Sequence, residues 1–166
     1  PGARWMCDIS FAPQTFFDAA KAKAWRAFFV SLEGEAGQFT VKPEPAAQTL
    51  LANIQVDGAN QTGSTLNLKG LTNTVGTPIL VPGDWMTVTL PTYGKQLVMV
   101  LTMTNTTGGG LATATFKPKL REAPANSAAV EIQNPYAVMS LTTDIAGWER
   151  DIMLYHSFTL NAQETY

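Results

Sequence analysis

The chain has 166 residues, of which 45% are hydrophobic and 14% are charged, and its formal net charge is −2. Since charged residues make up about 25% of a typical globular domain, the surface expected here is unusually neutral and rich in hydrogen-bonding groups. The eleven Lys and Arg residues form no basic block, and no apolar run approaches ~18 residues. Composition therefore argues against a nucleic-acid surface and against a transmembrane helix.

A neutral surface of this kind has two interpretations, and the sequence leaves both open. It suits extended contacts with other proteins, and it also suits a soluble β domain with a Thr-rich face. Cys7 is the single cysteine, so no internal disulfide is expected. Residues 1–10 lack the basic-then-apolar pattern of a secretory signal. We therefore expect synthesis in a reducing compartment.

The first elements in chain order are a strand over residues 5–11 and then an amphipathic helix over about residues 15–33. Thr15 is in place for an N-cap, and Gly34 is a suitable residue just past the helix end. The apolar stripe repeats every three to four residues, at Phe17, Ala20, Ala24, Phe28 and Leu32, and is widened by Trp25 and Phe29. This stripe predicts that Trp25 and Phe28 are buried against a sheet or a neighbouring subunit.

Short strand patterns follow the helix. They lie at residues 37–41, 50–56 and 65–71, separated by Pro43 and Pro45 and by a polar loop over residues 57–64. Residues 79–120 then predict a β meander. Its three strands are expected at residues 85–90, 96–104 and 111–116, each preceded by a turn rich in Gly, Pro or Asn.

The C-terminal strands are expected within about residues 130–160, and the polar tail over residues 161–166 is expected to be loose. About ten short strands with one helix indicate a mostly β (α+β) fold. We therefore expect a single domain over residues 1–166, either a β-barrel or a sandwich, with one amphipathic helix near the N-terminus.

The sequence contains no convergent set of reactive groups. His156 is the only histidine and lies on the apolar side of an alternating pattern, which is typical of a structural histidine. No zinc-protease, paired-cysteine, calcium-loop or nucleotide-binding motif occurs. We therefore predict no catalytic, cofactor-binding or metal-binding residue and no enzymatic activity. An unrecognised hydrolase is the competing hypothesis, but no nucleophile motif favours it.

Binding residues are found on loops more often than on strands or helices. We therefore take the candidate binding residues from two polar loops of the chain. The predicted protein-interface residues are Thr106, Thr107, Gly108, Gly109, Gly110, Asn60 and Gln61. The competing interpretation of residues 106–110 is a solvated hairpin tip.

Several stretches between about residues 20 and 125 resemble a known family. They are AWRAFFVSLEGEAGQF (24–39), VDGANQTGSTLNLKGL (56–71), ILVPGDWMTV (79–88), QLVMV (96–100) and TATFKPKLREAPA (113–125). The recurring features are a helix that ends in L-x-G-x-x-G-x-F, a GDW turn followed by QLVMV, and a P-x-L-R strand end. In these the chain is similar to small minor tail proteins of tailed bacteriophages, in the group of distal tail proteins.

The resemblance implies a structural protein that forms a ring, with six subunits as the expected number. Such a hub would link the tail tube to the tail tip or baseplate, and its partners would be other copies of itself, tail-tube proteins and tail-tip or hub proteins. It would be part of the virion and would be assembled in the cytoplasm of the bacterial host.

The alternative function is a carbohydrate- or receptor-binding β module of a phage tip or fibre. Such a module needs exposed aromatic side chains on loops. The loop-placed candidates are Tyr93, Tyr136 and Trp148.

Overall fold

The computed structural model describes residues 3–14, 19–71, 76, 78–143, 149–150 and 156–165. These residues divide into two compact units. The barrel unit consists mainly of Thr40–Ala137, and the sheet unit joins Trp5–Phe39 with Val138–Thr165. The single domain expected over residues 1–166 stays a prediction.

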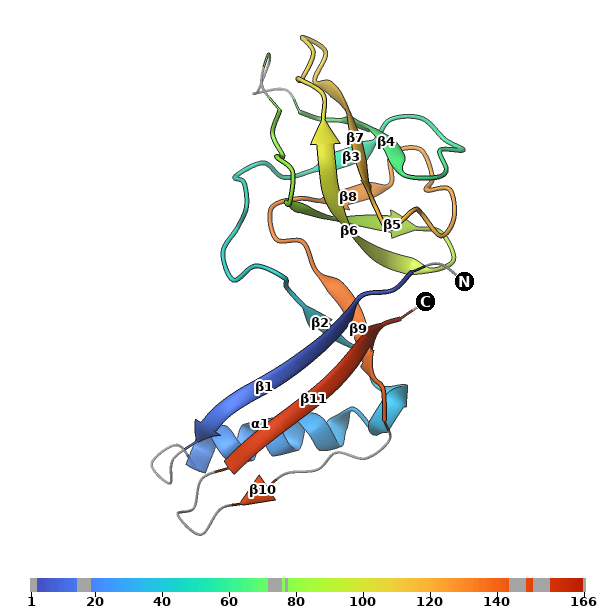
Figure 1. Cartoon of the computed structure of the whole chain (residues 1–166). Helices are drawn as coiled ribbons and strands as arrows, with labels where there is room; N and C mark the ends of the chain where they lie inside the picture. The colour runs from blue at the N-terminus through green and yellow to red at the C-terminus, as the bar shows by residue number, and fades with distance from the viewer. Residues whose placement is uncertain are drawn as a thin grey trace. The chain divides into compact units, whose positions relative to one another are not determined.

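The barrel unit contains a closed barrel of six antiparallel strands in the order β3–β4–β7–β6–β5–β8 (Figure 1). The strands are β3 (Ile54–Val56), β4 (Thr65–Lys69), β5 (Trp85–Leu90), β6 (Gly94–Met103), β7 (Leu111–Lys117) and β8 (Ala129–Glu131). The predicted meander is confirmed as β5, β6 and β7, which pair in sequence order. The mostly β class is also confirmed, and a barrel is the architecture present.

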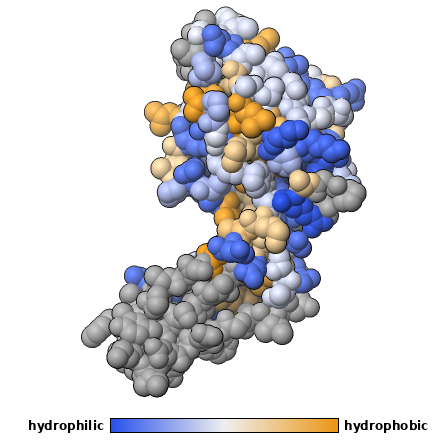
Figure 2. Space-filling view, in the orientation of Figure 1, coloured by the Kyte–Doolittle hydropathy of each residue, from blue (hydrophilic) through white to orange (hydrophobic). Residues whose placement is uncertain are grey.

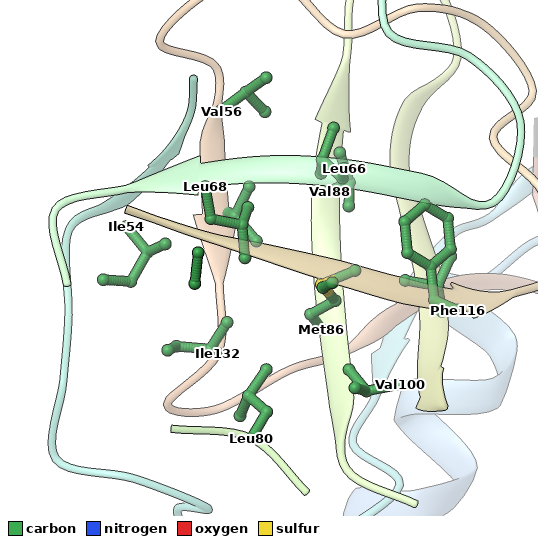
Figure 3. Packing of buried hydrophobic residues seen from close by; sticks show 14 of the residues in the cluster. Ile54, Val56, Leu66, Leu68, Leu80, Met86, Val88, Val100, Phe116 and Ile132 are labelled. Carbon is green, nitrogen blue, oxygen red and sulfur yellow. The ribbon is translucent and has the colours of Figure 1, made fainter. Parts of the chain in front are cut away.

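Alternation of apolar and polar residues explains which side of each barrel strand faces inward. In β4, Leu66 and Leu68 are fully buried, whereas Thr65 and Asn67 are exposed. The interior is filled by side chains from all six strands and from the loops between them (Figure 3). The fully buried core side chains include Phe116, Ile54, Val56, Leu66, Leu68, Leu80, Met86, Val100 and Ile132. Closure of the barrel also removes free strand edges from this unit.

The sheet unit contains a five-stranded sheet in the order β1–β11–β9–β2, with β10 also paired to β11. The strands are β1 (Met6–Gln14), β2 (Phe39–Val41), β9 (Ala137–Leu141), β10 (Glu149–Arg150) and β11 (His156–Glu164). β1 and β11 form the longest pair, with β1 at the edge of the sheet, and they are antiparallel from Met6 opposite Gln163 to Gln14 opposite His156.

The C-terminal tail is not loose, and that expectation is wrong for residues 161–164. They belong to β11, which pairs with β1 through Gln163 and with β9 through Ala162. Ala162 and Glu164 are buried, and the Glu164 N–H donates to the Trp5 carbonyl oxygen at 2.9 Å. Pairing with a strand on each side fixes this polar segment, because backbone hydrogen bonds do not depend on side-chain polarity.

The one α-helix among the described residues is α1 (Ala19–Ser31), which lies against the sheet and contacts β1 (Figure 1). Phe29 and Leu32 are buried with Leu141 of β9, and Trp25 and Phe28 pack half-buried against them. The Phe28 ring meets that of Phe39 edge-on, with centroids 5.9 Å apart.

The predicted stripe on α1 is therefore centred on the wrong residues. Ala20 and Ala24 are exposed, and Phe29 rather than Phe28 is the buried ring. The aromatic side chains, which gain most from burial, set the orientation of the helix, and the small alanines are left outside. Residues 15–18, which include the predicted cap, lie outside the described residues.

The L-x-G-x-x-G-x-F motif has a structural explanation at the end of α1. Gly34 has a left-handed φ of 71° and is the first residue of the short 3-10 helix η2 (Gly34–Ala36). A Cβ on Gly37 would overlap the backbone of Leu32, so the chain can pass this close only with glycine. Leu32 and Phe39, at the two ends of the motif, both join the apolar cluster beneath α1.

Candidate functional site

The predicted interface residues of the β6–β7 hairpin divide into buried and exposed ones. Thr106 and Gly110 are buried, whereas Thr107, Gly108 and Gly109 are exposed. The Thr106 carbonyl oxygen accepts the Gly76 N–H at 3.0 Å, and the Thr107 carbonyl oxygen accepts the Gly110 N–H at 2.9 Å. Only the three central residues of this loop therefore present side-chain or backbone surface to a partner.

Asn60 and Gln61 also differ from each other. Asn60 is exposed, with a left-handed φ of 61°. The Gln61 amide nitrogen donates to the carbonyl oxygens of Asp57 at 2.7 Å and Gly58 at 3.2 Å, and its oxygen accepts the Asn67 N–H at 2.7 Å. Gln61 therefore holds the loop in shape, and Asn60 is the better placed of the two to contact a partner.

The two loops do not form one site. The loop that contains Asn60 precedes β4 at Thr65, which pairs with Thr115 in the middle of β7. The other end of β4, Lys69, pairs with Leu111, where β7 leaves the hairpin. The loops thus lie at opposite ends of β4, and a partner could touch both only by spanning the barrel or by contacting its two ends separately.

The QLVMV and P-x-L-R motifs meet at one buried side chain, Gln96. Its amide nitrogen donates to the Lys119 carbonyl oxygen at 2.9 Å, and its oxygen accepts the Arg121 N–H at 3.0 Å. Leu120 between them is buried. Buried amide groups are usually hydrogen-bonded, and here the bonds of Gln96 connect β6 to the segment that follows β7. These motif residues therefore stabilise the barrel.

The GDW motif forms the turn that leads into β5. Gly83 has a φ of 101°, the Asp84 N–H donates to the Val81 carbonyl oxygen at 3.0 Å, and the Asp84 carboxylate accepts the Val81 N–H at 2.8 Å. The Gly83 N–H also donates to the Val100 carbonyl oxygen at 2.9 Å, which joins the turn to β6. This motif too has a folding role.

Gln48, in the connector between β2 and β3, makes a second set of side-chain hydrogen bonds, which the sequence does not predict. Its amide nitrogen donates to the carbonyl oxygens of Trp85 at 2.8 Å and Ile132 at 3.2 Å, and its oxygen accepts the Trp85 N–H at 2.8 Å. A glutamine in a Pro- and Ala-rich connector carries no sequence signal for this role. These hydrogen bonds hold the connector against β5 and against the residues after β8.

Replacement of Gln48 by alanine is expected to lower the free energy of unfolding by about 1–3 kcal/mol, because the Trp85 and Ile132 backbone groups lose their partner. Chemical denaturation monitored by tryptophan fluorescence measures the loss. Gln55→Ala is the matched control, since Gln55 is exposed on β3 and should change stability by less than about 0.5 kcal/mol. Equal stability of Gln48→Ala and the wild type would contradict a structural role for the connector.

Glu122 accepts hydrogen bonds from the turn between β5 and β6. Its carboxylate Oε1 accepts the N–H of Thr92 at 2.6 Å and that of Tyr93 at 2.9 Å. Desolvation raises the pKa of Glu122, but the hydrogen bonds from the Tyr93 and Thr92 N–H groups and from the Thr92 side chain outweigh it, so the pKa lies below its ordinary value of 4.5.

This lowered pKa predicts an acid-sensitive contribution to stability. A carboxylate with a depressed pKa in the folded state stabilises the fold above its unfolded pKa, and the contribution is lost as the pH falls through the folded pKa. We therefore expect Glu122→Gln to melt below the wild type at neutral pH and to approach it at pH values below 4.5. Thermal melts of both proteins across this range test the expectation, and a difference that does not depend on pH would contradict it.

The described titratable groups form no reactive set. Cys7 is a half-buried free thiol, and burial, together with the neighbouring Asp8 charge, raises its pKa, which disfavours the nucleophilic thiolate. Within the described ranges, no three His, Cys, Asp or Glu residues lie close enough together to hold a metal ion. No helix in the same part of the chain is long and apolar enough to cross a membrane. The His156 side chain lies outside the description.

The outer surface of the barrel strands β4, β6 and β7 is neutral and internally hydrogen-bonded. The hydroxyl oxygens of Thr102 and Thr115 lie 2.5 Å apart, and the Thr113 hydroxyl donates to the Asn67 side chain at 2.8 Å. Figure 2 shows the barrel unit covered largely by pale, weakly polar residues, with blue and orange patches between them. Such a surface offers contact area without a strong charge.

Of the loop aromatics proposed for a carbohydrate- or receptor-binding module, Tyr93 is 39% exposed and Tyr136 is half-buried. Trp148 lies outside the described residues. The described structure therefore offers one exposed ring from this set, and stacking on a sugar usually relies on more extensive aromatic surface.

Comparison with known proteins finds no family model and no curated protein that matches this chain.

Proposed function

We propose that the chain is a structural subunit of a bacteriophage tail, a ring-forming hub or distal tail protein that links the tail tube to the tail tip or baseplate. In this proposal it is not an enzyme, and its two units fold together as one domain with the helix near the N-terminus. The resemblance of the helix-end, GDW and P-x-L-R motifs supports the proposal, and the observation that carries it physically is the open sheet of the sheet unit.

In the part of the chain that the structure describes, three strands pair on one side only: β1 and β2, which end the strand order, and the two-residue β10. Unpaired backbone groups on an edge strand are ready to pair with another chain, and soluble proteins usually protect them. β1 is nine residues long, which is enough for several backbone hydrogen bonds. Met6, near its start, is 72% exposed.

The hydrogen bond between the Glu164 N–H and the Trp5 carbonyl oxygen shows which groups of β1 face outward. In an antiparallel pair, hydrogen-bonded and non-hydrogen-bonded residues alternate. Trp5 forms a hydrogen-bonded pair with Glu164, so the next such pair along β1 is Cys7 with Ala162. The backbone N–H and C=O groups of Met6 and Asp8, which lie between and beyond these pairs, therefore point outward from the β1 edge, away from β11. They are available to a further strand.

A head-to-tail contact between different surfaces of identical subunits closes into a ring when the rotation fits. β1 and β2 lie at opposite edges of one sheet, so each copy offers two different edges. We propose six subunits because the resembled family builds six-fold tails. The neutral barrel surface and the exposed loop residues Asn60, Thr107, Gly108 and Gly109 would contact neighbouring copies, tail-tube proteins or tail-tip proteins.

The proposal places the protein in the virion tail, after assembly in the bacterial cytoplasm. Native mass spectrometry and negative-stain microscopy of the purified chain test the ring. We expect a species with the mass of six 17.9-kDa chains, seen as six-fold rings with a central opening. A chain that remains monomeric at every concentration would contradict a self-assembling ring.

A further inference from the structure

The side of α1 that does not pack on the sheet carries a shallow apolar groove. It is lined by Lys23, Arg26, Ala27, Val30 and Ser31. Val30 is 68% exposed, and Ala27 and Lys23 are exposed as well. The groove is separate from the core of the sheet unit, because Phe29 and Leu32 point to that core from the other side of the helix.

All charged side chains on α1 are positive. The helix segment AAKAKAWRAFFVS contains three basic residues and no acidic one. Two of the basic residues, Lys23 and Arg26, stand at the groove, with apolar surface between them and Val30. A ligand that fits this groove therefore has small apolar groups flanked by a carboxylate.

A segment of the barrel unit has this chemistry. Residues 44–47, with the sequence Glu-Pro-Ala-Ala, are exposed and, with Gln48, line a cleft together with Gly83 and Asp84. The cleft thus has carboxylates at Glu44 and Asp84 and three small apolar residues between Glu44 and Gln48. Nearby in the same connector, Leu50 is 90% exposed.

One end of the segment is also anchored to the barrel unit. Gln48, which follows it directly, makes three side-chain hydrogen bonds to Trp85 and Ile132, and its N–H donates to the Gln133 carbonyl oxygen at 3.0 Å. Proline at positions 43 and 45 further restricts the backbone. With one end anchored and two prolines in the backbone, the segment loses less conformational entropy on binding than a free peptide would.

We infer that the α1 groove of one copy binds residues 44–47 of a second copy, with Glu44 beside Lys23, an inference that rests on the self-association in the proposed function. Charge complementarity selects this occupant, because the chain presents both halves of the contact on different units. Each copy has one groove and one segment, so in the proposed ring the groove of each copy binds the segment of the next, head to tail. Burial of Val30 against Pro45 and the two alanines gives affinity, and the charges set the register.

Sedimentation velocity of charge-reversed variants tests the contact. Lys23→Glu and Glu44→Lys place like charges opposite each other, and each is expected to weaken association on the order of tenfold. Carrying both changes in one chain, or mixing the two single variants, restores an opposite pair and should recover most of the lost affinity. Lys119→Glu is the matched control: it makes the same charge change at an exposed residue of the barrel unit and should leave association unchanged.

A second variant tests the apolar part of the groove. Val30→Glu should keep the fold, because Val30 is exposed and glutamate is a better helix former than valine. It should nevertheless weaken association at least as much as Lys23→Glu, since it places a carboxylate on the floor of the groove. Circular dichroism checks that the helix remains.

The outcomes separate this inference from the proposed function. Rings that form normally in Lys23→Glu and Val30→Glu would overturn the inference while the proposed function stands. Normal rings from these variants that fail to enter virions would show that another tail protein occupies the groove, which also overturns it. A double variant no better than the single ones would exclude the Lys23–Glu44 pairing, and a wild-type chain that never associates would overturn both proposals.

Discussion

Replacement of Phe116 by alanine is expected to lower the free energy of unfolding of the barrel unit by about 3–5 kcal/mol. Phe116 is a fully buried core side chain and comes from β7, the strand that pairs with both β4 and β6. Its ring points into the barrel interior (Figure 3). Because the closed barrel cannot easily collapse around the missing ring, the loss includes a cavity contribution as well as the lost apolar burial.

Urea denaturation of Phe116→Ala and of the control Leu111→Ala measures this difference. Leu111 lies on the same strand but is 39% exposed, so its replacement should change the unfolding free energy far less. Equal losses in the two variants would mean that the barrel interior does not dominate the stability of this unit.

Replacement of Asp8 by proline is expected to block ring formation while the isolated chain stays folded. The backbone N–H of Asp8 points away from β11, so proline removes a hydrogen-bond donor from the free edge of the sheet. Proline on an edge strand is a natural means of preventing edge-to-edge pairing. We expect association at least about tenfold weaker, which corresponds to about 1.4 kcal/mol.

Cys7→Pro is the matched control, because the N–H of Cys7 faces Ala162 of β11. Proline there removes a hydrogen bond within the sheet and should lower the melting temperature strongly, whereas Asp8→Pro should lower it little. Mass photometry and thermal melts of both variants give the comparison. An Asp8→Pro chain that still assembles would exclude the β1 edge from the ring contact.

The barrel could be predicted from the sequence because its strands alternate and its turns carry Gly, Pro and Asn. In β4, Leu66 and Leu68 face the interior and Asn67 faces outward. This alternation indicates both that the segment is a strand and which of its faces is buried. The order in which β3 and β8 close the barrel could not be predicted, because each has three residues and contributes a short apolar pattern. Closure depends on contacts far apart in the chain, such as Ile54 opposite Val130.

The orientation of α1 shows where periodicity is ambiguous. Residues 24, 25, 28, 29 and 32 are all apolar, and two overlapping stripes fit them equally well. The structure buries the stripe with the larger side chains and leaves Ala24 outside. The groove beside Val30 is a consequence of this orientation and could not be located from the repeat alone.

The structural roles of Gln96 and Gln48 and the position of the candidate interface could be predicted from the sequence to different degrees. Gln96 interrupts a strand of buried apolar residues, and a polar residue in such a place suggests a hydrogen-bonded role. Gln48 lies in a connector and gives no such signal. The hairpin over residues 106–110 and the Asn60 loop have similar polar compositions, but composition contains no information on which end of a strand a loop occupies. Strand pairing places the two loops at opposite ends of β4.

The most direct test of the proposed function is the location of the protein in phage particles. Gold-labelled antibodies against this chain, applied to tailed particles made from the genome that encodes it, reveal the location by electron microscopy. The proposal predicts label at the distal end of the tail tube, where the tube meets the tip or baseplate. Tailed particles that carry no label there, together with absence of the chain from their protein content by mass spectrometry, would contradict it.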